Sequence, residues 1–278
     1  MDNNRKYSII VVTFNNADGL ERTLDSIRLL NYGQKEVIVI DGGSKDGSLD
    51  IMGRNEDIIT VAVSEKDKGI YNAMNKGIKV AKGEYLQFLN SGDWLWDGDV
   101  LQEVLSDEVC GNADIVYGKT MVHDVNGYVF ESGHHFDPFT PYSLVAYSMP
   151  HQSTFTKRML FERIGLFDEE FRLSGDLDFF FRAIIINHAL TKHIDRSITH
   201  FAGGGLSMTA PGLEAEEKKM ILEKYMPSGS ILDFEQYLAY RKSDKLLKEN
   251  NKAIEVYDTL HRRWFTRKIM HFLYRLTK

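Results

Sequence analysis

The amino-acid sequence predicts an α/β fold: a mainly parallel, Rossmann-like sheet flanked by helices, with a C-terminal helical extension. Two observations lead to this prediction. Apolar runs alternate with helical patterns through the first hundred residues, which is the order expected of a parallel sheet with crossover helices. Helical periodicity then dominates nearly all of the chain after Pro211. We therefore expect one domain over residues 1–211 and a helical extension over residues 212–278.

The first three strands follow from composition. Residues 7–13 form a run rich in Ile and Val, which is typical of a strand buried on both faces. Residues 18–30 carry Leu and Ile at helical spacing. The strand pattern returns at residues 36–41 and 58–64. Between them, residues 46–52 begin with an Asp that can cap a helix, so we expect a short helix there.

A further helix and strand complete the parallel part. Residues 70–82 place apolar side chains at 3.6-residue spacing, and Gly83 ends the helix. Residues 85–89 then form the fourth strand. Ligands of such sheets bind outside the carboxyl ends of the strands. Four polar residues fall at these ends: Thr13, Asp41, Glu65 and Asp93.

The middle of the chain has a different pattern. Residues 113–119 and 128–132 predict strands, with an Asn-Gly turn between them. Four of the five prolines lie within residues 138–211 and bracket a loop-rich segment that we expect to cover the sheet. Helical patterns at residues 157–164 and 175–187 interrupt this segment.

The composition limits the classes of function. Of the 278 residues, 43% are hydrophobic and 27% are charged, which are ordinary values for a globular protein. The net charge of −6 argues against nucleic acid as a partner. The single cysteine, Cys110, excludes an internal disulfide and is typical of a reducing compartment. No apolar run approaches membrane-spanning length and no secretion signal is found, so we expect a cytoplasmic protein.

An acidic turn follows the fourth strand, with the sequence Asn-Ser-Gly-Asp at residues 90–93. A carboxylate at a strand tip binds a divalent cation when diphosphate oxygens and water complete the coordination shell. The turn therefore predicts a Mn²⁺ or Mg²⁺ site with Asp93 as a ligand. The alternative is that Asp93 caps a helix that starts near residue 97.

Two other segments suit a nucleotide. Asp41 leads into a Gly-Gly-Ser turn that lets a ligand approach the backbone, although an ordinary β-to-α turn has the same sequence. Residues 67–75 open a helix with free N–H groups beside Lys68, which suits a phosphate; the alternative is a surface lysine before an amphipathic helix. Asn72 and Asn75 are poor helix formers, and this favours a binding role.

Side chains in the second half suit an acceptor. Asp176 begins an apolar helix and is a candidate general base for an acceptor hydroxyl, and with Asp178 it is equally suited to cap that helix. His151, Gln152 and Asp178 are candidate acceptor contacts, although a lone histidine is more often structural. His200, followed closely by three glycines, is a second candidate metal ligand or the anchor of a loop that closes over the donor.

Together these motifs resemble the family-2 glycosyltransferases of GT-A fold. The match spans about residues 5–210 and lies in the order and spacing of six segments: 9–16, 39–47, 64–77, 83–93, 150–155 and 175–182. The resemblance implies an inverting, metal-dependent transfer of a sugar from a UDP- or GDP-sugar to a hydroxyl of a glycan or lipid-linked acceptor. The Asn-Ser-Gly-Asp turn is similar to that of the branch that builds bacterial surface polysaccharides.

The resemblance also assigns roles to residues. Asp176 matches the catalytic base, and Asp93 matches the last acid of the metal-binding motif. The sequence departs from the pattern where Asn90 and Gly92 replace acids of that motif and where Gly175 replaces the glutamate before the base. The candidate donor-binding residues are Thr13, Phe14, Asn15, Asp41, Gly43, Lys68, Gly69, Asn72, Asn75, Asn90, Ser91 and Gly92.

The last segment, residues 261–278, holds six Lys or Arg residues and no acid, with apolar residues at helical spacing. This pattern favours a basic amphipathic helix on an anionic membrane surface; packing on its own domain or on a homodimer partner is the alternative. Two other functions stay open. One is a non-catalytic nucleotide-sugar or glycan binding protein, against which Asp93 and Asp176 argue. The other is a nucleotidyltransferase, which favours Gly and Arg where residues 13–18 have neither.

Overall fold

The structure is a computed structural model that describes residues 7–136, 138–205 and 210–249. The chain divides into two compact units, Met1–Tyr225 and Met226–Lys278. Every strand and every predicted site residue belongs to the first unit. The division into two domains that the sequence suggested stays a prediction.

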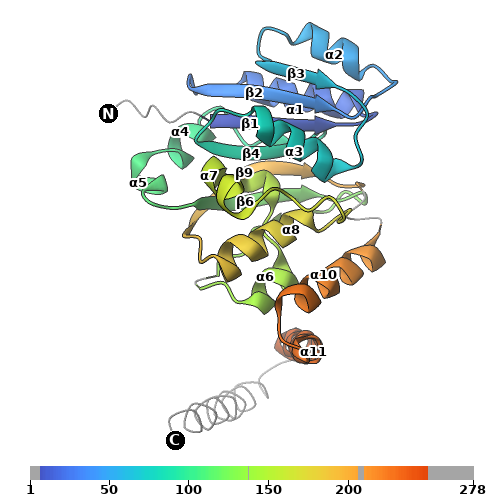
Figure 1. Ribbon diagram of the computed structural model, residues 1–278, viewed down its shortest axis with the longest axis vertical. Helices are drawn as coiled ribbons and strands as arrows, with labels where there is room; N and C mark the ends of the chain where they lie inside the picture. Colours follow the sequence, from blue (N-terminus) through green and yellow to red (C-terminus); the bar gives the residue numbers. More distant parts are fainter. Residues whose placement is uncertain (1–6, 137, 206–209, 250–278) are drawn as a thin grey trace, which may run out of the picture. The chain divides into compact units, whose positions relative to one another are not determined.

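Half of the sheet is parallel, as predicted. Strands β3 (Val61–Ser64), β2 (Lys35–Asp41), β1 (Tyr7–Thr13) and β4 (Tyr85–Asn90) lie side by side in this order (Figure 1). β1 is buried along its whole length, because both of its faces are covered. The register places the last residues of β1 and β2 opposite each other, so their carboxyl ends meet at one edge of the sheet.

Helices α1 (Ala17–Arg28) and α3 (Ile70–Val80) cover the two faces of β1 (Figure 1). α1 packs its apolar side chains against the face that carries Ile9. On the other face, α3 approaches Ile10 so closely that a Cβ on Gly77 would come within 2.4 Å of it. A side chain on Gly77 would push the helix off the sheet, which explains a glycine in the middle of a helix.

The second half of the sheet corrects one expectation. The order continues from β4 through β8 (Thr154–Lys157), β6 (Ile115–His123) and β9 (Thr191–Ala202) to β5 (Trp94–Leu95), and β7 (Val129–Ser132) pairs with β6. The strands predicted at residues 113–119 and 128–132 correspond to β6 and β7, whereas the segment expected to cover the sheet with loops adds β8 and β9 to it. β9 went unnoticed because only two of its twelve residues are buried, so it has no apolar run.

The remaining helices of the first unit lie between strands in the chain, except α10, which follows the last strand. They are α2 (Ser48–Arg54), α4 (Val100–Val104), α5 (Asp107–Cys110), α6 (Pro141–Tyr147), η1 (His151–Ser153), α7 (Arg158–Ile164), α8 (Gly175–Phe180), its continuation η2 (Phe181–Ile186), and α10 (Pro211–Tyr225). α11 (Ser230–Glu249) is the described part of the second unit. Residues 226–229 separate α10 from α11. The predicted basic helix of residues 261–278 lies outside the described residues.

Candidate active site

The turn after β4 aims one carboxylate into the protein. Ser91 N donates to Val12 O of β1 at 2.9 Å, and Asp93 N donates to Asn90 O at 3.0 Å. Gly92 adopts a positive φ of 110°, which a side chain would strain. The four residues that stood out in the sequence thus form a tight turn, and this turn leaves Asp93 only 2% exposed.

Asp93 is a buried carboxylate with one unsatisfied oxygen. Its Oδ1 accepts a hydrogen bond from Ala202 N at 3.2 Å, whereas its Oδ2 has no partner among the described residues. Burial raises the pKa of Asp93 to about 7, against the opposing charge of His151. Within the same described ranges, the buried Thr13 Oγ1 and Asn90 Oδ1 also have no hydrogen-bond partner. Such buried oxygens cost free energy unless a ligand satisfies them.

These three oxygens come from the ends of the neighbouring strands β1 and β4 and from the turn after β4, and their chemical type suits a divalent cation. A carboxylate, an amide oxygen and a hydroxyl are hard ligands of the kind that Mg²⁺ and Mn²⁺ prefer. No group of three or more His, Cys, Asp or Glu side chains in the described part of the chain is placed to hold a metal ion. A cation at the Asp93 turn therefore needs further oxygen ligands from a substrate, as a diphosphate supplies.

His200 lies in an aromatic stack next to this turn. Its ring stacks between Trp94 and Trp96, with centroid distances of 4.7 Å to each. His123 Nε2 lies 2.9 Å from His200 Nδ1. Burial, and then the charge of His123, lowers the pKa of His200, which favours the neutral ring that metal ions bind. The role of His200 as a metal ligand stays a prediction.

Asp41, the predicted nucleoside contact, is fully buried and holds its own turn together. Its carboxylate accepts backbone N–H bonds from Gly43 at 3.1 Å and from Ser44, and Ser64 Oγ donates to it at 2.6 Å. Asn15 N in turn donates to Ser44 Oγ at 2.7 Å. This network joins the carboxyl ends of β1, β2 and β3, so Asp41 shapes the edge at which a donor would bind.

An open aromatic surface lies beside that turn. Phe14, at the end of β1, is 61% exposed although it is a large apolar side chain. A Cβ on Gly42 would come within 2.3 Å of Asp67 Oδ2 and 3.2 Å of the Phe14 ring, so ring and carboxylate lie together over this glycine. A stacking face beside a hydrogen-bond acceptor suits a nucleobase. Asp67 was not among the predicted site residues, because a single acid within a charged run carries no distinct signal.

The two asparagines of α3 fasten that helix to a distant loop. Asn75 is buried; its Nδ2 donates to Phe167 O at 2.9 Å and its Oδ1 accepts from Phe167 N at 3.1 Å. Asn72 Nδ2 donates to Glu169 at 2.8 Å, and Asn72 Oδ1 accepts from Lys68 N at 3.3 Å. These bonds explain why poor helix formers occupy a helix. Donor binding by this segment, including Gly69, stays a prediction.

Asp176 stands at the start of α8 with both oxygens engaged. Oδ1 accepts from Leu177 N at 2.9 Å and from the Tyr71 hydroxyl at 3.0 Å, while Oδ2 lies 3.0 Å from His151 Nδ1. A Cβ on Gly175 would come within 2.8 Å of the Tyr71 ring, so the glycine makes room for Tyr71 to reach the carboxylate. Oδ1 uses both of its lone pairs in these bonds, whereas Oδ2 has one contact and keeps a lone pair for an acceptor hydroxyl.

One imidazole ring joins this carboxylate to the β4 turn. His151 Nδ1 faces Asp176, and His151 Nε2 lies 3.4 Å from Asn90 Nδ2. Burial lowers the pKa of His151, but the hydrogen bond and charge of Asp176 and the charge of Asp93 outweigh it and raise the pKa. The candidate base and the candidate metal site, 83 residues apart in the numbering, therefore share a single polar path.

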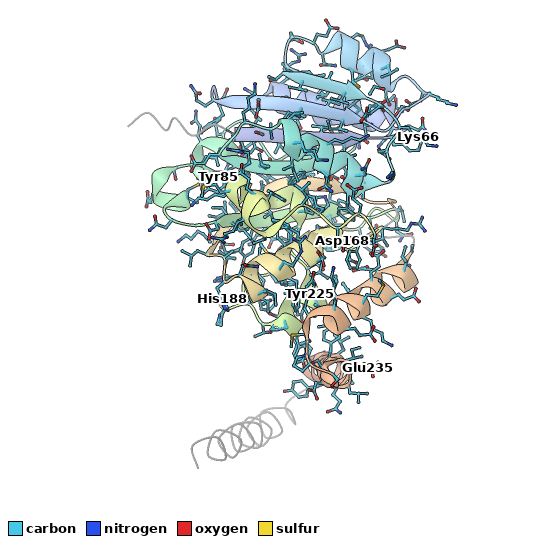
Figure 2. All side chains as sticks on the ribbon, viewed as in Figure 1. Lys66, Tyr85, Asp168, His188, Tyr225 and Glu235 are labelled. Atoms are coloured by element: carbon cyan, nitrogen blue, oxygen red, sulfur yellow. The ribbon has the colours of Figure 1, made fainter. Side chains whose placement is uncertain are left out.

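Asp178 has a different environment, although it follows Asp176 by two residues. It is fully buried and accepts hydrogen bonds from Arg182 Nε at 2.9 Å, Tyr225 OH at 2.7 Å and Lys224 Nζ at 3.4 Å. Tyr225, the last residue of α10, is labelled in Figure 2. These contacts attach α10 to α8. The structure thus gives Asp178 a structural task, and its predicted contact with an acceptor stays a prediction.

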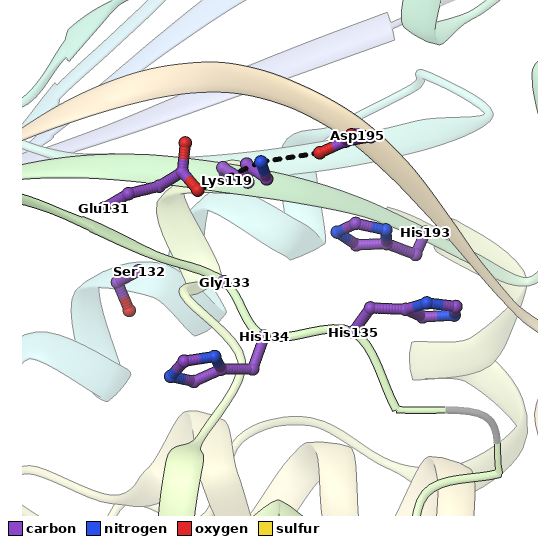
Figure 3. A pocket seen from close by; sticks show the side chains of 8 residues that line it. All are labelled: Lys119, Glu131, Ser132, Gly133, His134, His135, His193 and Asp195. Atoms are coloured by element: carbon purple, nitrogen blue, oxygen red, sulfur yellow. Dashed lines mark ion pairs between the residues drawn. The ribbon is translucent and has the colours of Figure 1, made fainter. Parts of the chain in front are cut away.

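A pocket of about 400 Å³ opens beside Asp176 and includes His151 and Gln152, two of the predicted acceptor contacts. Most of its other lining side chains are apolar. Another pocket of similar size contains none of the predicted site residues (Figure 3). In it Lys119 pairs with Glu131 at 3.0 Å and with a second carboxylate, so its charge is neutralised. The pocket beside Asp176 is therefore the candidate acceptor site.

Known proteins match this chain in sequence. Residues 8–182 match the family model of Glycosyl transferase family 2. A PGL/p-HBAD biosynthesis glycosyltransferase of Mycobacterium bovis is 33% identical over 210 residues, which cover 73% of this chain and 79% of that protein. An uncharacterized glycosyltransferase of Mycobacterium tuberculosis is 33% identical over 193 residues, covering 66% of this chain and 71% of that relative.

Solved structures share the fold. A crystal structure of S. aureus TarS matches with a TM-score of 0.61 at 22% identity, covering 78% of this chain; the match spans 64% of the TarS structure. The mannosyltransferase PcManGT from Pyrobaculum calidifontis, solved with GDP-Man and Mn²⁺, gives a TM-score of 0.59 at 20% identity, covering 84% of this chain and 70% of PcManGT. These likenesses confirm the predicted GT-A fold. Because the family model covers well over half of the chain, this protein belongs to glycosyl transferase family 2 and is a glycosyltransferase.

Proposed function

We propose that this glycosyltransferase moves a sugar, with inversion at the anomeric carbon, from a UDP- or GDP-sugar to a hydroxyl of a glycan or lipid-linked acceptor in surface polysaccharide synthesis. The observation that carries this proposal is the polar path from Asn90 through His151 to Asp176. It puts a base close to the strand tip that suits a diphosphate. A base on one side of the donor sugar and a leaving group on the other is the arrangement that inversion requires.

The chemistry then follows from Asp176. Its carboxylate takes the proton of the acceptor hydroxyl, whose oxygen forms the new bond to the anomeric carbon. The bond from that carbon to the diphosphate oxygen breaks, and the diphosphate leaves with the electron pair. Leu177 N and Tyr71 OH hold Oδ1, and His151 faces Oδ2, so the carboxylate keeps one orientation.

We propose that the unpaired oxygens of Thr13, Asn90 and Asp93 hold a divalent cation. When bound, such a cation supplies positive charge beside the departing diphosphate. The burial that raises the pKa of Asp93 to about 7 supports this proposal, because a cation beside the carboxylate would favour its ionised form. The presence of Mn²⁺ in the PcManGT structure supports it as well.

The donor is proposed to lie along the carboxyl ends of β1, β2 and β4. There Phe14 offers an exposed ring to the base, and the turn of Asp41 and Gly43 offers backbone contacts. TarS was solved with UDP-GlcNAc and PcManGT with GDP-Man, which supports a nucleotide-sugar donor for this chain. The exposed start of α3, with Lys68, is proposed to contact phosphate oxygens.

A lipid-linked acceptor would place the protein at a membrane surface. We propose that the enzyme acts at the cytoplasmic face of a membrane and that residues 261–278 bind anionic lipid or form a homodimer contact. Among the described residues, no helix has both the length and the apolar character needed to cross a bilayer. Sedimentation with anionic liposomes tests this: the protein should bind, and a variant lacking residues 261–278 should not. Equal sedimentation of both would contradict the membrane contact.

Donor turnover tests the proposed reaction. UDP-, GDP- and dTDP-sugars are incubated with the protein and Mn²⁺, Mg²⁺ or EDTA, and released nucleoside diphosphate is measured. We expect metal-dependent release from one class of donor and none in EDTA. Asp50→Asn, on the exposed side of α2, is the control that should keep the wild-type rate. Pyrophosphate release from a nucleoside triphosphate would indicate a nucleotidyltransferase, and donor binding without any turnover would indicate a binding protein.

A further inference from the structure

Strand β7 separates two pockets of different chemistry. Successive side chains of a strand point to opposite faces, so Phe130 and Val129 face different sides. Phe130 lines the pocket beside Asp176, whereas its other neighbour Glu131 lines the polar pocket with Lys119 (Figure 3). Both pockets measure about 400 Å³, so they differ in lining and not in size.

The pocket beside Asp176 combines few ionisable groups with an apolar wall. Its ionisable side chains are His151, Asp176, Glu214 and Tyr147, and Glu214 is paired with Lys218 at 2.6 Å. Gln152 and three serines add uncharged polar groups to the lining. The apolar wall comes from segments far apart in the chain: Val122, Phe130, Met149, Leu173, Leu177 and Phe201. A reacting hydroxyl thus has polar partners at Asp176 and His151, and the group that carries it faces hydrocarbon.

This lining discriminates between acceptors. A bare sugar would turn hydroxyls toward the wall, where each lost hydrogen bond costs about 1–3 kcal/mol. An aryl or alkyl group would instead gain about 25 cal/mol for each Å² of apolar surface it buries. Phe130 is a second observation in favour of an apolar ligand, because this large aromatic side chain lines the pocket and is 51% exposed. An apolar ligand would cover it.

We propose that this pocket binds an aryl or alkyl group that the acceptor carries next to the hydroxyl deprotonated by Asp176. The acceptor is then a glycolipid or an aryl glycoside, and not a free oligosaccharide. This inference rests on the proposed function for the role of Asp176 and adds the chemical class of the acceptor.

Ligand binding tests the pocket without knowledge of the acceptor sugar. The probes are n-octyl β-D-glucopyranoside, below its micelle concentration, and methyl β-D-glucopyranoside. Titration calorimetry on the full chain should show that the octyl glucoside binds at least about tenfold more tightly, because only it fills the apolar wall. Equal affinity for the two glucosides would overturn the proposal.

A pair of variants on β7 locates the binding. Phe130→Ser should weaken binding of the octyl glucoside about fivefold, as expected when part of an aromatic contact is lost. Val129→Ser is the matched control, since Val129 is similarly exposed, at 54%, but does not line the pocket. Leu173→Gln, deeper in the wall, gives a second reading if Phe130→Ser alters the fold by circular dichroism. Equal losses in Phe130→Ser and Val129→Ser would overturn the assignment.

Turnover separates this inference from the proposed function. With the donor identified by hydrolysis, octyl and p-nitrophenyl glycosides of several sugars are compared as acceptors with the methyl glycosides. We expect the apolar glycosides to show KM values at least about tenfold lower. If the donor is turned over and the methyl glycosides have the same KM values as the apolar glycosides, the inference is wrong and the proposed function still holds. If octyl glucoside binds at Phe130 but no donor is turned over, the apolar pocket is supported and the proposed function is wrong.

Discussion

The donor side and the acceptor side of the site are built differently. On the donor side, Asp41 ends strand β2 and Asp93 lies in the turn directly after β4. On the acceptor side, Val122, Leu173 and Phe201 come together from separate parts of the chain. Turns present backbone groups and carboxylates, whereas packing of distant side chains makes an apolar wall. The groups that would bind a charged donor therefore come from short segments of the chain, whereas the groups that would select an acceptor are brought together only by the tertiary structure.

The two functional aspartates show the same contrast. Asp93 is buried, and one of its oxygens has no hydrogen-bond partner among the described residues. Asp176 has hydrogen-bonding neighbours at both oxygens and borders a pocket. Substitutions at the two positions should therefore separate donor binding from the chemical step.

Asp176→Asn should produce the largest effect. It removes the base and keeps the size of the side chain, so kcat for transfer should fall by about 10³-fold. The affinity for the donor should stay within about twofold, because the donor side is built from other turns. Steady-state transfer rates and calorimetric donor titration check both values. An active variant would refute the base assignment and remove the contrast between the two sides.

Asp93→Asn should act on the other side. Donor binding in Mn²⁺ should weaken by about 100-fold, because the amide lacks the charge that attracts the cation. Binding in EDTA should be nearly the same for variant and wild type, which provides the internal control. Titration of the identified donor with and without Mn²⁺ measures both. An equal loss in EDTA would show that Asp93 contacts the donor without a metal ion.

The pH dependence of stability offers a second test of Asp93. Its folded-state pKa of about 7 lies above the usual carboxyl value. The protonated form is therefore favoured on folding, and this contribution is complete below about pH 4 and lost as the pH rises through 7. Without metal, the wild-type Tm should fall relative to that of Asp93→Asn between pH 5 and pH 8. A constant Tm difference across this range would contradict the raised pKa.

Asp178→Asn should lower stability and not catalysis. Removing one partner of a buried ion pair typically costs about 3–5 kcal/mol, and Asp178 is fully buried against Arg182, Tyr225 and Lys224. We expect a loss of about 3 kcal/mol in the free energy of unfolding, measured by urea titration, with donor affinity unchanged. Asp176→Asn is the matched control, two residues away. Greater destabilisation by Asp176→Asn would reverse the roles that we give to the two acids.

Phe14→Ala should have the smallest effect. Loss of a stacking contact is worth about 0.5–1.5 kcal/mol, so the KM for the donor should rise about fivefold with little change in kcat. Leu29→Ala is the control, because Leu29 is also an exposed apolar residue, at 70%, at the end of α1. If Phe14→Ala leaves the KM for the donor unchanged, Phe14 does not stack on the donor.

Strands β1, β2 and β4 were predictable because burial on both faces leaves a plain signal, whereas β3 has no buried residue and begins at Val61, three residues later than expected. β1 begins and ends where the apolar run does, and β4 extends its run by one residue. β9 and the two-residue β5 lacked this signal, since few of their side chains are buried. Asp67 was missed for a related reason: its value lies in its nearness to Phe14 across Gly42, and no local pattern encodes that contact.

By itself the sequence determined the fold class, the parallel strands and the acidic turn that ends in Asp93. The patterns that indicate buried strands and turns are formed by residues close together in the chain. Only the tertiary structure decided what those residues contact. It joined Asp176 to Asn90 through His151, turned Asp178 into a buried partner of α10 and assembled the apolar wall. A side chain's partners come from segments far away in sequence, and long-range packing alone brings those segments together.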